Sequence, residues 1–265
     1  MRPGRARGTT DGDFMKKYDV LFFDLFDTVI NFSFTNLPLI ELSGVRARTT
    51  SKEVYEVFRR LHPDVPFPEF YDHFISSYRE FQDLKLAENR EYPNRDRFLM
   101  MLSHMDLAGG ESVPALADDM VKAHMKGLAS AVSFPPENES ALLALRDAKY
   151  RMAIVSNFDY APTAYSLIEK FGLMRFFEKV IISEEVGWRK PSPVIFEDAL
   201  KAMGAEPGAS LFTGDNFHAD VAGSKNAGMD SVWLNSRNES PEGLDPEPDY
   251  IIPVFPDVLE VLPQS

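Results

Sequence analysis

A short apolar run, Val20–Phe23, ends abruptly at the carboxylate of Asp24. An unbroken run of this kind is typical of a strand that is buried on both faces, as in a parallel sheet covered by helices. Open sheets of this type bind their ligands beyond the carboxyl ends of the strands, where Asp24 would stand. Taken alone, the stretch fits a loop that begins with Asp24 and Asp27 equally well, because aspartate is frequent in turns.

The second half of the chain alternates between short apolar runs and helical patterns. Further strands are expected at 151–155, 180–182, 210–213, 231–234 and 250–252, with helices at 137–149, 162–171, 193–203, 219–227 and 256–262. Three of these helices are followed by glycine, the residue favoured just past a helix end. The alternation predicts an α/β fold, a Rossmann-like parallel sheet with right-handed crossovers and helices on both faces.

Helical patterning fills most of the region between the first strand and the second. Four helices are expected there, beginning at Ser51, after the proline-rich stretch 63–68, at 95 and at 113. Residues 31–50 are expected to be irregular because proline and glycine interrupt them. We therefore expect an inserted α-helical cap domain at 45–131 and a core domain at 18–44 and 132–265. Residues 1–17 are expected to form a disordered extension, since they begin with a run rich in Arg, Gly and Thr.

The composition narrows the possible partners. Asp and Glu total 41 against 28 Lys and Arg, which gives a formal net charge of −13. Such a chain repels polyanions, so neither nucleic acid nor a membrane surface is expected as a partner. The absence of cysteine excludes disulfides, thiolate catalysis and cysteine-bound zinc. No secretory signal or membrane-spanning run is recognisable, and we expect a cytoplasmic protein whose oligomeric state the sequence leaves open.

Polar residues follow the predicted core strands in a way that suits phosphate chemistry. In chain order they are Asp24, the pair Ser156-Asn157, Lys190 and the pair Gly214-Asp215, with Asp220 five residues on. The carboxyl ends of parallel strands share one edge of a sheet, so these residues are expected to converge in space. Each of them alone is commonly a helix cap or a solvated side chain, and it is their order along the chain that favours a site.

The motifs Phe23–Thr28, Val155–Asp159, Arg189–Pro193 and Gly214–Gly228 resemble those of the haloacid dehalogenase-like hydrolase superfamily. The resemblance covers residues 18–262 and points to the phosphatases that carry a helical cap after the first strand. It implies an enzyme whose nucleophile, Asp24, attacks phosphorus and forms an aspartyl-phosphate, which splits one hard step into two. It also implies that Ser156 and Asn157 bind the phosphoryl group. Lys190 would offset the charge of the nucleophile and the phosphate.

A cation is expected beside the nucleophile, because two carboxylates would otherwise repel an anionic substrate. Mg²⁺ fits, since it prefers hard oxygen ligands and binds through a few carboxylates together with substrate and water. By resemblance, its ligands are a carboxylate oxygen of Asp24, the backbone carbonyl of Phe26, and Asp215. Asp220 is implied to lie behind them, or to reach the metal through water.

Position 26 departs from the pattern of the phosphatases that the chain resembles. They usually carry a second aspartate there, which protonates the leaving group and then activates water, and the Phe26 ring can do neither. Asp27 stands where the family usually has glycine. Neighbouring residues leaving a strand point to different sides, so Asp27 is a catalytic candidate rather than a direct replacement. The absence of an aspartate at position 26 matters, because general acid–base catalysis is worth ~10²–10⁴-fold in rate.

Four outcomes stay open after this substitution. The enzyme is a slow phosphatase, it acts on esters whose leaving group needs no proton, another group (Asp27, Asp159 or His218) supplies the proton, or the protein binds phosphate without hydrolysing it. A 2-haloacid dehalogenase is a further alternative, since these relatives also lack the second aspartate because a halide leaves unprotonated. They typically lack the Gly-Asp pair that this chain carries at 214–215. We therefore expect a magnesium-dependent phosphatase acting on a small phosphorylated metabolite.

Overall fold

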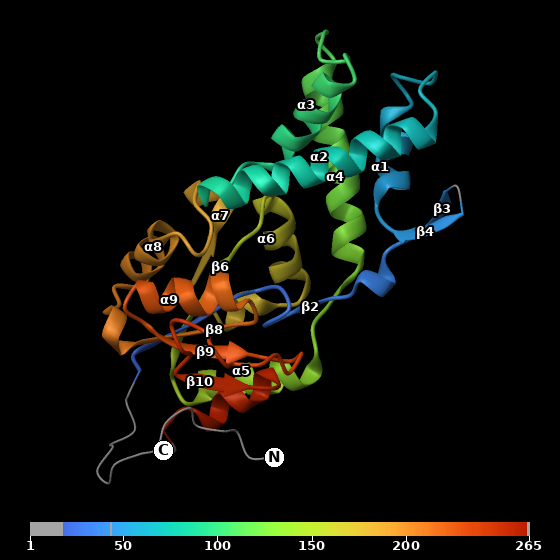
Figure 1. Ribbon diagram of the computed structural model, residues 1–265. Coiled ribbons are helices and arrows are strands. Elements are labelled where there is room, and N and C mark those ends of the chain that lie inside the picture. Colours follow the sequence, from blue (N-terminus) through green and yellow to red (C-terminus); the bar gives the residue numbers. More distant parts are fainter. Residues whose placement is uncertain (1–17, 43, 264–265) are drawn as a thin grey trace. The chain divides into compact units, whose positions relative to one another are not determined.

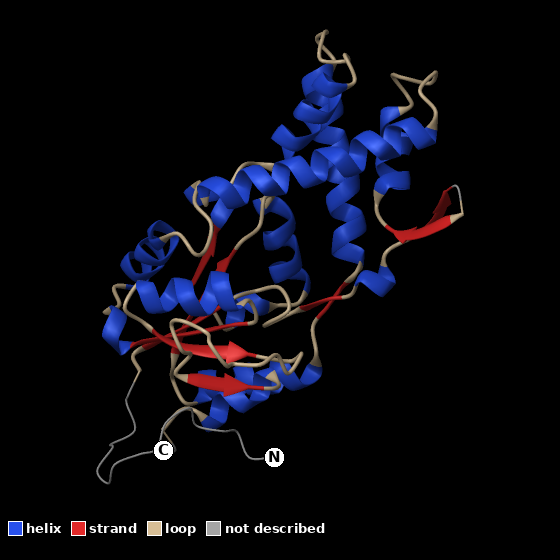
Figure 2. Cartoon of the chain, in the orientation of Figure 1, coloured by secondary structure: helices blue, strands red, loops and turns tan. Residues whose placement is uncertain are grey.

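The computed structural model describes residues 18–42 and 44–263 (Figures 1 and 2). Within them the chain forms two compact units. The first contains the described residues up to Asn31, then Ser133–Phe158 and the described residues from Ile168; the second contains the described part of Phe32–Val132 and Asp159–Leu167. The extension expected at 1–17 lies outside the described residues. The domain boundaries expected at 45 and 132 stay a prediction.

Parallel strands make up the six-stranded sheet of the first unit, in the order β10-β9-β8-β1-β6-β7. Their bounds are β1 Val20–Phe23, β6 Arg151–Ser156, β7 Lys179–Ile182, β8 Ser210–Gly214, β9 Asp230–Leu234 and β10 Tyr250–Ile252. β1 lies between β6 and β8, where Phe23 is opposite Ile154 and Thr213. The expected parallel sheet is confirmed, and its inner strand β1 is the one that leads to Asp24.

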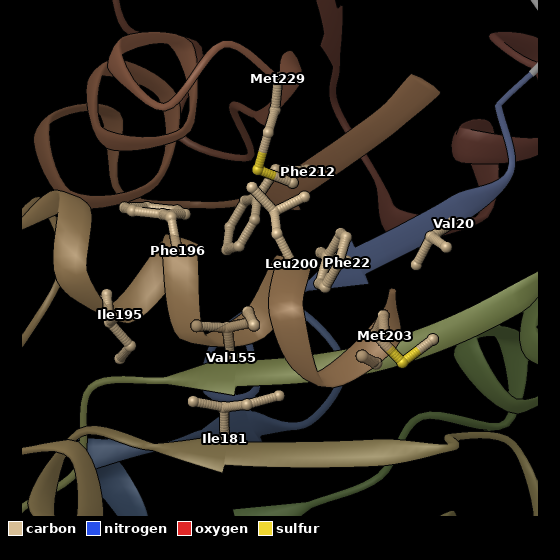
Figure 3. Close-up of a cluster of buried hydrophobic side chains, with 12 residues drawn as sticks. Val20, Phe22, Val155, Ile181, Ile195, Phe196, Leu200, Met203, Phe212 and Met229 are labelled. Atoms are coloured by element: carbon tan, nitrogen blue, oxygen red, sulfur yellow. The ribbon is translucent and has the colours of Figure 1, made fainter. Parts of the chain in front are cut away.

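Alternate residues of β1 pack on opposite faces of the sheet. Phe22 lies in an apolar cluster formed with helix α8 (Pro193–Met203), as Figure 3 shows. On the other face the Phe23 ring contacts the rings of Phe177 and Phe255, with centroids 6.1 and 5.6 Å away. Burying one phenylalanine side chain is worth about 1.5–3 kcal/mol. Both faces of the strand are therefore covered, which explains its unbroken apolar run.

Helical segments fill the connections of the first unit. They are α5 Pro136–Asp147, α7 Ser183–Val186, α8, α9 Gly223–Asn226, and the short segments η2 Leu173–Arg175, η3 Pro207–Ala209, η4 Phe217–Ala222 and η5 Phe255–Glu260. Helix α6 (Ala161–Lys170) is divided between the two units. The single helix expected at 219–227 is instead the π-helical turn η4 continued by α9. The helix expected at 256–262 is the 3₁₀ segment η5.

Four helices dominate the second unit, as the sequence predicts. They are α1 Ser51–Phe58, α2 Phe67–Glu88, α3 Asn94–His104 and α4 Val113–Ser130. Helix α4 packs against α1 and α3, and α2 packs against α3. No helix in the described part of the chain is both long and apolar enough to cross a membrane.

A β-hairpin precedes these helices, where irregular structure was expected. β3 (Leu39–Leu42) pairs antiparallel with β4 (Val45–Arg48), so the expectation of a purely helical insert from residue 45 is wrong. Gly44 adopts a φ of 79° at the turn, as tight hairpins require. The strands are mostly exposed and lack the apolar alternation that identifies a half-buried strand. β2 (Asn31–Phe32) and β5 (Val132–Ser133) form a further two-stranded sheet.

Candidate active site

Three neighbouring strands bring predicted site residues to one edge of the sheet. Asp24 follows β1, Ser156 ends β6 and Asp215 follows β8. Lys190 reaches the same edge from the segment between α7 and α8. Its Nζ lies 2.6 Å from Asp24 Oδ1 and 2.7 Å from Asp220 Oδ1. Residues that are up to 196 positions apart in the sequence therefore gather in the first unit.

Lys190 is buried, and three oxygen atoms lie close to its ammonium group. Nζ donates to Asp24 Oδ1 at 2.6 Å and to the backbone carbonyl of Val155 at 2.8 Å, and it forms an ion pair with Asp220 Oδ1 at 2.7 Å. An ammonium group carries three donors and no acceptor, so these two hydrogen bonds and the ion pair hold the side chain in place. The lysine is consequently a fixed positive charge next to Asp24.

Asn157 fixes the backbone of the same lysine. Its Nδ2 donates to the carbonyl of Lys190 at 2.9 Å, and the N–H of Lys190 donates to its Oδ1 at 2.7 Å. The resemblance implies that Asn157 binds phosphate, whereas in the structure both ends of its amide engage Lys190. A contact across 33 positions left no local signal in the sequence.

The Ser156 hydroxyl, unlike the Asn157 amide, is left unpaired in the described part of the chain. It is fully buried, and its Oγ has no hydrogen-bond partner among the described residues. An unpaired buried polar group costs about 1–3 kcal/mol. A phosphoryl oxygen would satisfy this hydroxyl, which fits the role that the sequence predicts for Ser156.

Asp220 is held close to the end of β8. Its side chain is buried, and its Oδ2 accepts a hydrogen bond from the N–H of Asn216 at 3.0 Å. A Cβ atom at Gly214 would overlap with the Asp220 carboxylate, so this position has room only for glycine. Gly214 therefore leaves the space in which the Asp220 carboxylate lies.

The cluster holds three carboxylates and one ammonium group. Carboxylate oxygens of Asp24, Asp215 and Asp220 lie within 4.8 Å of one another. Burial raises the pKa of Asp24 to about 7, because the charge of Lys190 compensates only in part and the other two carboxylates add to the rise. Burial and the charges of Asp220 and Asp27 raise the pKa of Asp215 to about 6. The cluster is therefore short of positive charge.

This donor set fits a divalent cation. Several hard oxygen donors that lie close together and lack compensating charge are the kind of site that Mg²⁺ occupies. Asp24 and Asp215 are the two carboxylates that the resemblance implies as metal ligands. Asp220 offers an oxygen to the same set, although its Oδ1 is also paired with Lys190.

Phe26 and Asp27, which follow the candidate nucleophile, have different surroundings. The Phe26 ring stacks on the ring of Phe158, with centroids 4.7 Å apart and 28° between the planes. Asp27 is exposed and has a φ of 58°, in the left-handed region that glycine favours, and its charge acts on Asp215. Phe158 is not among the site residues expected from the sequence, although its place directly after Ser156-Asn157 puts it at the same edge of the sheet.

The other candidate proton donors are His218 and Asp159. His218 is exposed on η4. Asp159 belongs to the second unit, where its Oδ2 lies 2.7 Å from Lys85 Nζ. Burial alone would raise the pKa of Asp159, but Lys85 and a hydrogen bond from Asn94 outweigh it and hold the pKa below its usual value. A carboxyl group with a lowered pKa is ill suited to donate a proton near neutral pH.

Residues 18–228 match the haloacid dehalogenase-like hydrolase family, and the chain belongs to this family. Two of its relatives are named glyceraldehyde 3-phosphate phosphatase. The one from Methanothermobacter thermautotrophicus is 35% identical over 143 residues, which span 54% of this chain and 62% of the relative. The one from Pyrococcus furiosus is 28% identical over 250 residues, which span 94% of each chain.

A solved structure of a 2-haloacid dehalogenase from Pseudomonas syringae has the same fold. The two align with a TM-score of 0.68 at 22% identity, over 93% of this chain and 98% of the other. The predicted superfamily, the α/β fold class and the prediction of a hydrolase are thus confirmed. The roles of the individual site residues are proposals, developed below.

Proposed function

We propose that this hydrolase is a magnesium-dependent phosphatase that cleaves a small phosphorylated metabolite through an aspartyl-phosphate on Asp24. The observation that carries the proposal is the surplus of carboxylates around the buried Lys190 ammonium group, with the unpaired Ser156 hydroxyl at the neighbouring strand end. Phosphate esters are also the substrates that the names of the two relatives indicate for those proteins. The net charge of −13 makes a small anion a more suitable partner than nucleic acid.

Asp24 acts as the nucleophile in this proposal. Lys190 donates to its Oδ1 and so fixes the orientation of the carboxylate. In the first step a bond forms between an Asp24 oxygen and phosphorus while the ester oxygen departs with the electron pair of its bond. In the second step a water oxygen attacks phosphorus, the bond to Asp24 breaks, and inorganic phosphate is released. Ser156 donates a hydrogen bond to a phosphoryl oxygen in both steps.

Asp24, the backbone carbonyl of Phe26, and Asp215 would hold Mg²⁺, with an oxygen of Asp220 nearby. The bound ion would offset the charge that carboxylates and phosphoryl oxygens bring together. Lys190 alone leaves two of the three negative charges of the cluster uncompensated. We therefore expect the affinity for an anionic substrate to depend on the metal.

The test is phosphate release from a panel of phosphate monoesters, with Mg²⁺ and after chelation. It compares the native protein with Asp24→Asn and with Asp147→Asn, since Asp147 is an exposed aspartate paired with Arg146 on the surface. We expect magnesium-dependent release that Asp24→Asn lowers by about 10⁴-fold or more, as removal of a nucleophile does, and that Asp147→Asn leaves unchanged.

Other results would separate the alternatives. Halide release from a 2-haloacid without metal would support a dehalogenase. Phosphate binding without turnover of any ester would support a binding protein. Phosphate release that survives Asp24→Asn at full rate would contradict the proposed nucleophile.

A further inference from the structure

Phe26 and Phe158 occupy equivalent places at neighbouring strand ends. Phe26 lies two residues beyond Asp24, and Phe158 lies two residues beyond Ser156. β1 and β6 are parallel neighbours in the sheet, which lets the two rings stack with centroids 4.7 Å apart. An aromatic pair therefore stands just past the proposed nucleophile and the proposed phosphate-binding hydroxyl.

The two rings are only partly buried, whereas Phe22 and Phe23 on the preceding strand are fully buried. Stacking of two aromatic rings is worth about 0.5–1.5 kcal/mol. It holds the pair together and still leaves part of its apolar surface open to a further group. Because each ring stands two residues beyond a proposed phosphate-contacting residue, a substrate that fits both must be charged at one end and flat and apolar at the other.

The backbone under each ring is fixed by hydrogen bonds. On the Phe26 side, the N–H of Asp27 donates to the carbonyl of Ile30 at 2.7 Å. On the other side, the N–H of Phe158 donates to Oγ of the buried Ser183 at 2.9 Å. Binding groups held in advance lose little conformational freedom when a ligand arrives. The pair is thus a preorganised surface.

A ring at position 26 also sets a chemical requirement. It gives no proton to the departing oxygen, so esters of an oxygen that is stable as an anion have the advantage. A phenol has a pKa of about 10. Water has a pKa of about 15.7, and an alkyl alcohol resembles water in this respect more than it resembles a phenol. Flatness and a stable leaving anion coincide in the phosphate monoesters of aromatic rings.

We propose that Phe26 and Phe158 form a platform for the leaving group, and that the substrates of this enzyme are aryl phosphates. The proposal rests on the phosphatase function proposed above and adds the chemical class of the leaving group. In the first step the oxygen of Asp24 bonds to phosphorus as the bond from phosphorus to the aryl oxygen breaks. The electron pair stays on the phenolate, which later takes a proton from water.

The test compares phenyl phosphate with cyclohexyl phosphate, which has a ring of similar size that is neither flat nor a stable leaving group. The variants are Phe26→Leu and Phe158→Leu, which keep apolar volume and remove the flat surface. Phe134→Leu is the matched control, because Phe134 is a partly exposed ring paired with Phe171 at 6.0 Å in the same unit. Thermal unfolding checks that each variant is folded.

For the native enzyme we expect kcat/KM to favour phenyl phosphate by about 10²-fold or more, the range of the missing proton transfer. Phe158→Leu should raise KM for phenyl phosphate about two- to tenfold, the range of one ring contact, and leave the cyclohexyl ester unaffected. Phe134→Leu should change neither. Equal losses on both esters, or an unchanged preference in both platform variants, would overturn the platform.

A binding measurement separates this proposal from the function on which it rests. Calorimetry with the Asp24→Asn protein, which does not turn over the ester, compares the affinities for the two phosphates directly. Tighter binding of phenyl phosphate that is lost when Phe158→Leu is added supports the platform. Equal affinities overturn it, even where Asp24- and magnesium-dependent phosphate release confirms the phosphatase.

Discussion

Two buried groups of charges, one in each unit, are each built around a lysine and differ in their balance of charge. In the first unit Lys190 faces the carboxylates of Asp24 and Asp220, with Asp215 close by. In the second unit Lys85 Nζ lies 2.7 Å from both Glu91 Oε1 and Asp159 Oδ2, and Asn94 Nδ2 donates to the same Asp159 oxygen at 3.0 Å. These contacts make up a structural cluster.

The pKa values of the carboxyl groups move in opposite directions. Burial raises the pKa of Asp24 to about 7, because one lysine cannot compensate three carboxylates. In the structural cluster, the lysine and the amide overcome the effect of burial and lower the pKa of Asp159. Perturbed carboxylates with uncompensated charge are typical of sites that bind a ligand, and a compensated group is typical of structure. The difference thus favours the first unit's cluster as the candidate functional site.

The largest expected effect comes from removing each lysine. Lys190→Met and Lys85→Met both leave buried carboxylates without a cation, which should lower the free energy of unfolding by about 3–5 kcal/mol. Mg²⁺ should restore part of this loss in Lys190→Met alone, because only that cluster has the donor set of a metal site. Urea unfolding with chelator and with Mg²⁺ measures both variants.

Phosphate release provides the second readout for the same pair of variants. Lys190→Met should abolish turnover, whereas the folded fraction of Lys85→Met should keep it. If Mg²⁺ stabilised both variants equally, or stabilised neither of them, the two clusters would not differ in metal binding.

A smaller effect is expected from Phe26→Asp, which adds a fourth carboxylate to the first unit's cluster. If the new carboxyl group supplies the missing proton transfer, turnover of cyclohexyl phosphate should rise about tenfold or more, within the ~10²–10⁴-fold that such help is worth. Phe26→Leu is the control and should bring no gain. Initial rates of phosphate release with Mg²⁺ measure the effect. A folded Phe26→Asp variant whose rate does not rise would show that position 26 does not face the leaving group.

The smallest effect is a pH dependence of stability that comes from Asp159. Its folded pKa lies below the unfolded value of about 3.9, so its stabilising contribution is present above that value and is lost as the pH falls through the folded pKa. The difference in unfolding free energy between native protein and Asp159→Asn should be constant from about pH 7 to pH 5 and shrink below about pH 4. Denaturant unfolding across this range measures it.

Two outcomes would change this interpretation of Asp159. A difference in stability that stays constant down to about pH 3 would mean that Lys85 does not hold its pKa down. Loss of turnover in a fully folded Asp159→Asn protein would show that the reaction requires Asp159 and that its role is not structural alone.

Much of the fold was predictable because it depends on local pattern. The run Val20–Phe23 is the strand β1 with the bounds that the sequence indicates, since a strand covered on both faces must be apolar throughout. The placement of the site residues was predictable as well. The carboxyl ends of parallel strands share one edge of the sheet, so Asp24, Ser156 and Asp215 lie at the same edge. The hairpin at 39–48 escaped prediction because exposed strands need no apolar alternation.

The sequence by itself determined the family, the parallel sheet, the helical insert and the residues at the strand ends. Tertiary structure alone decided what each side chain meets there. In the folded chain the Asn157 amide binds the backbone of Lys190, and the Phe26 ring stacks on Phe158. Lys85, one of many lysines in the sequence, pairs with an aspartate 74 positions away. The physical reason is that local pattern records burial and direction, whereas charge balance and ring contacts depend on partners that only the folded chain brings together.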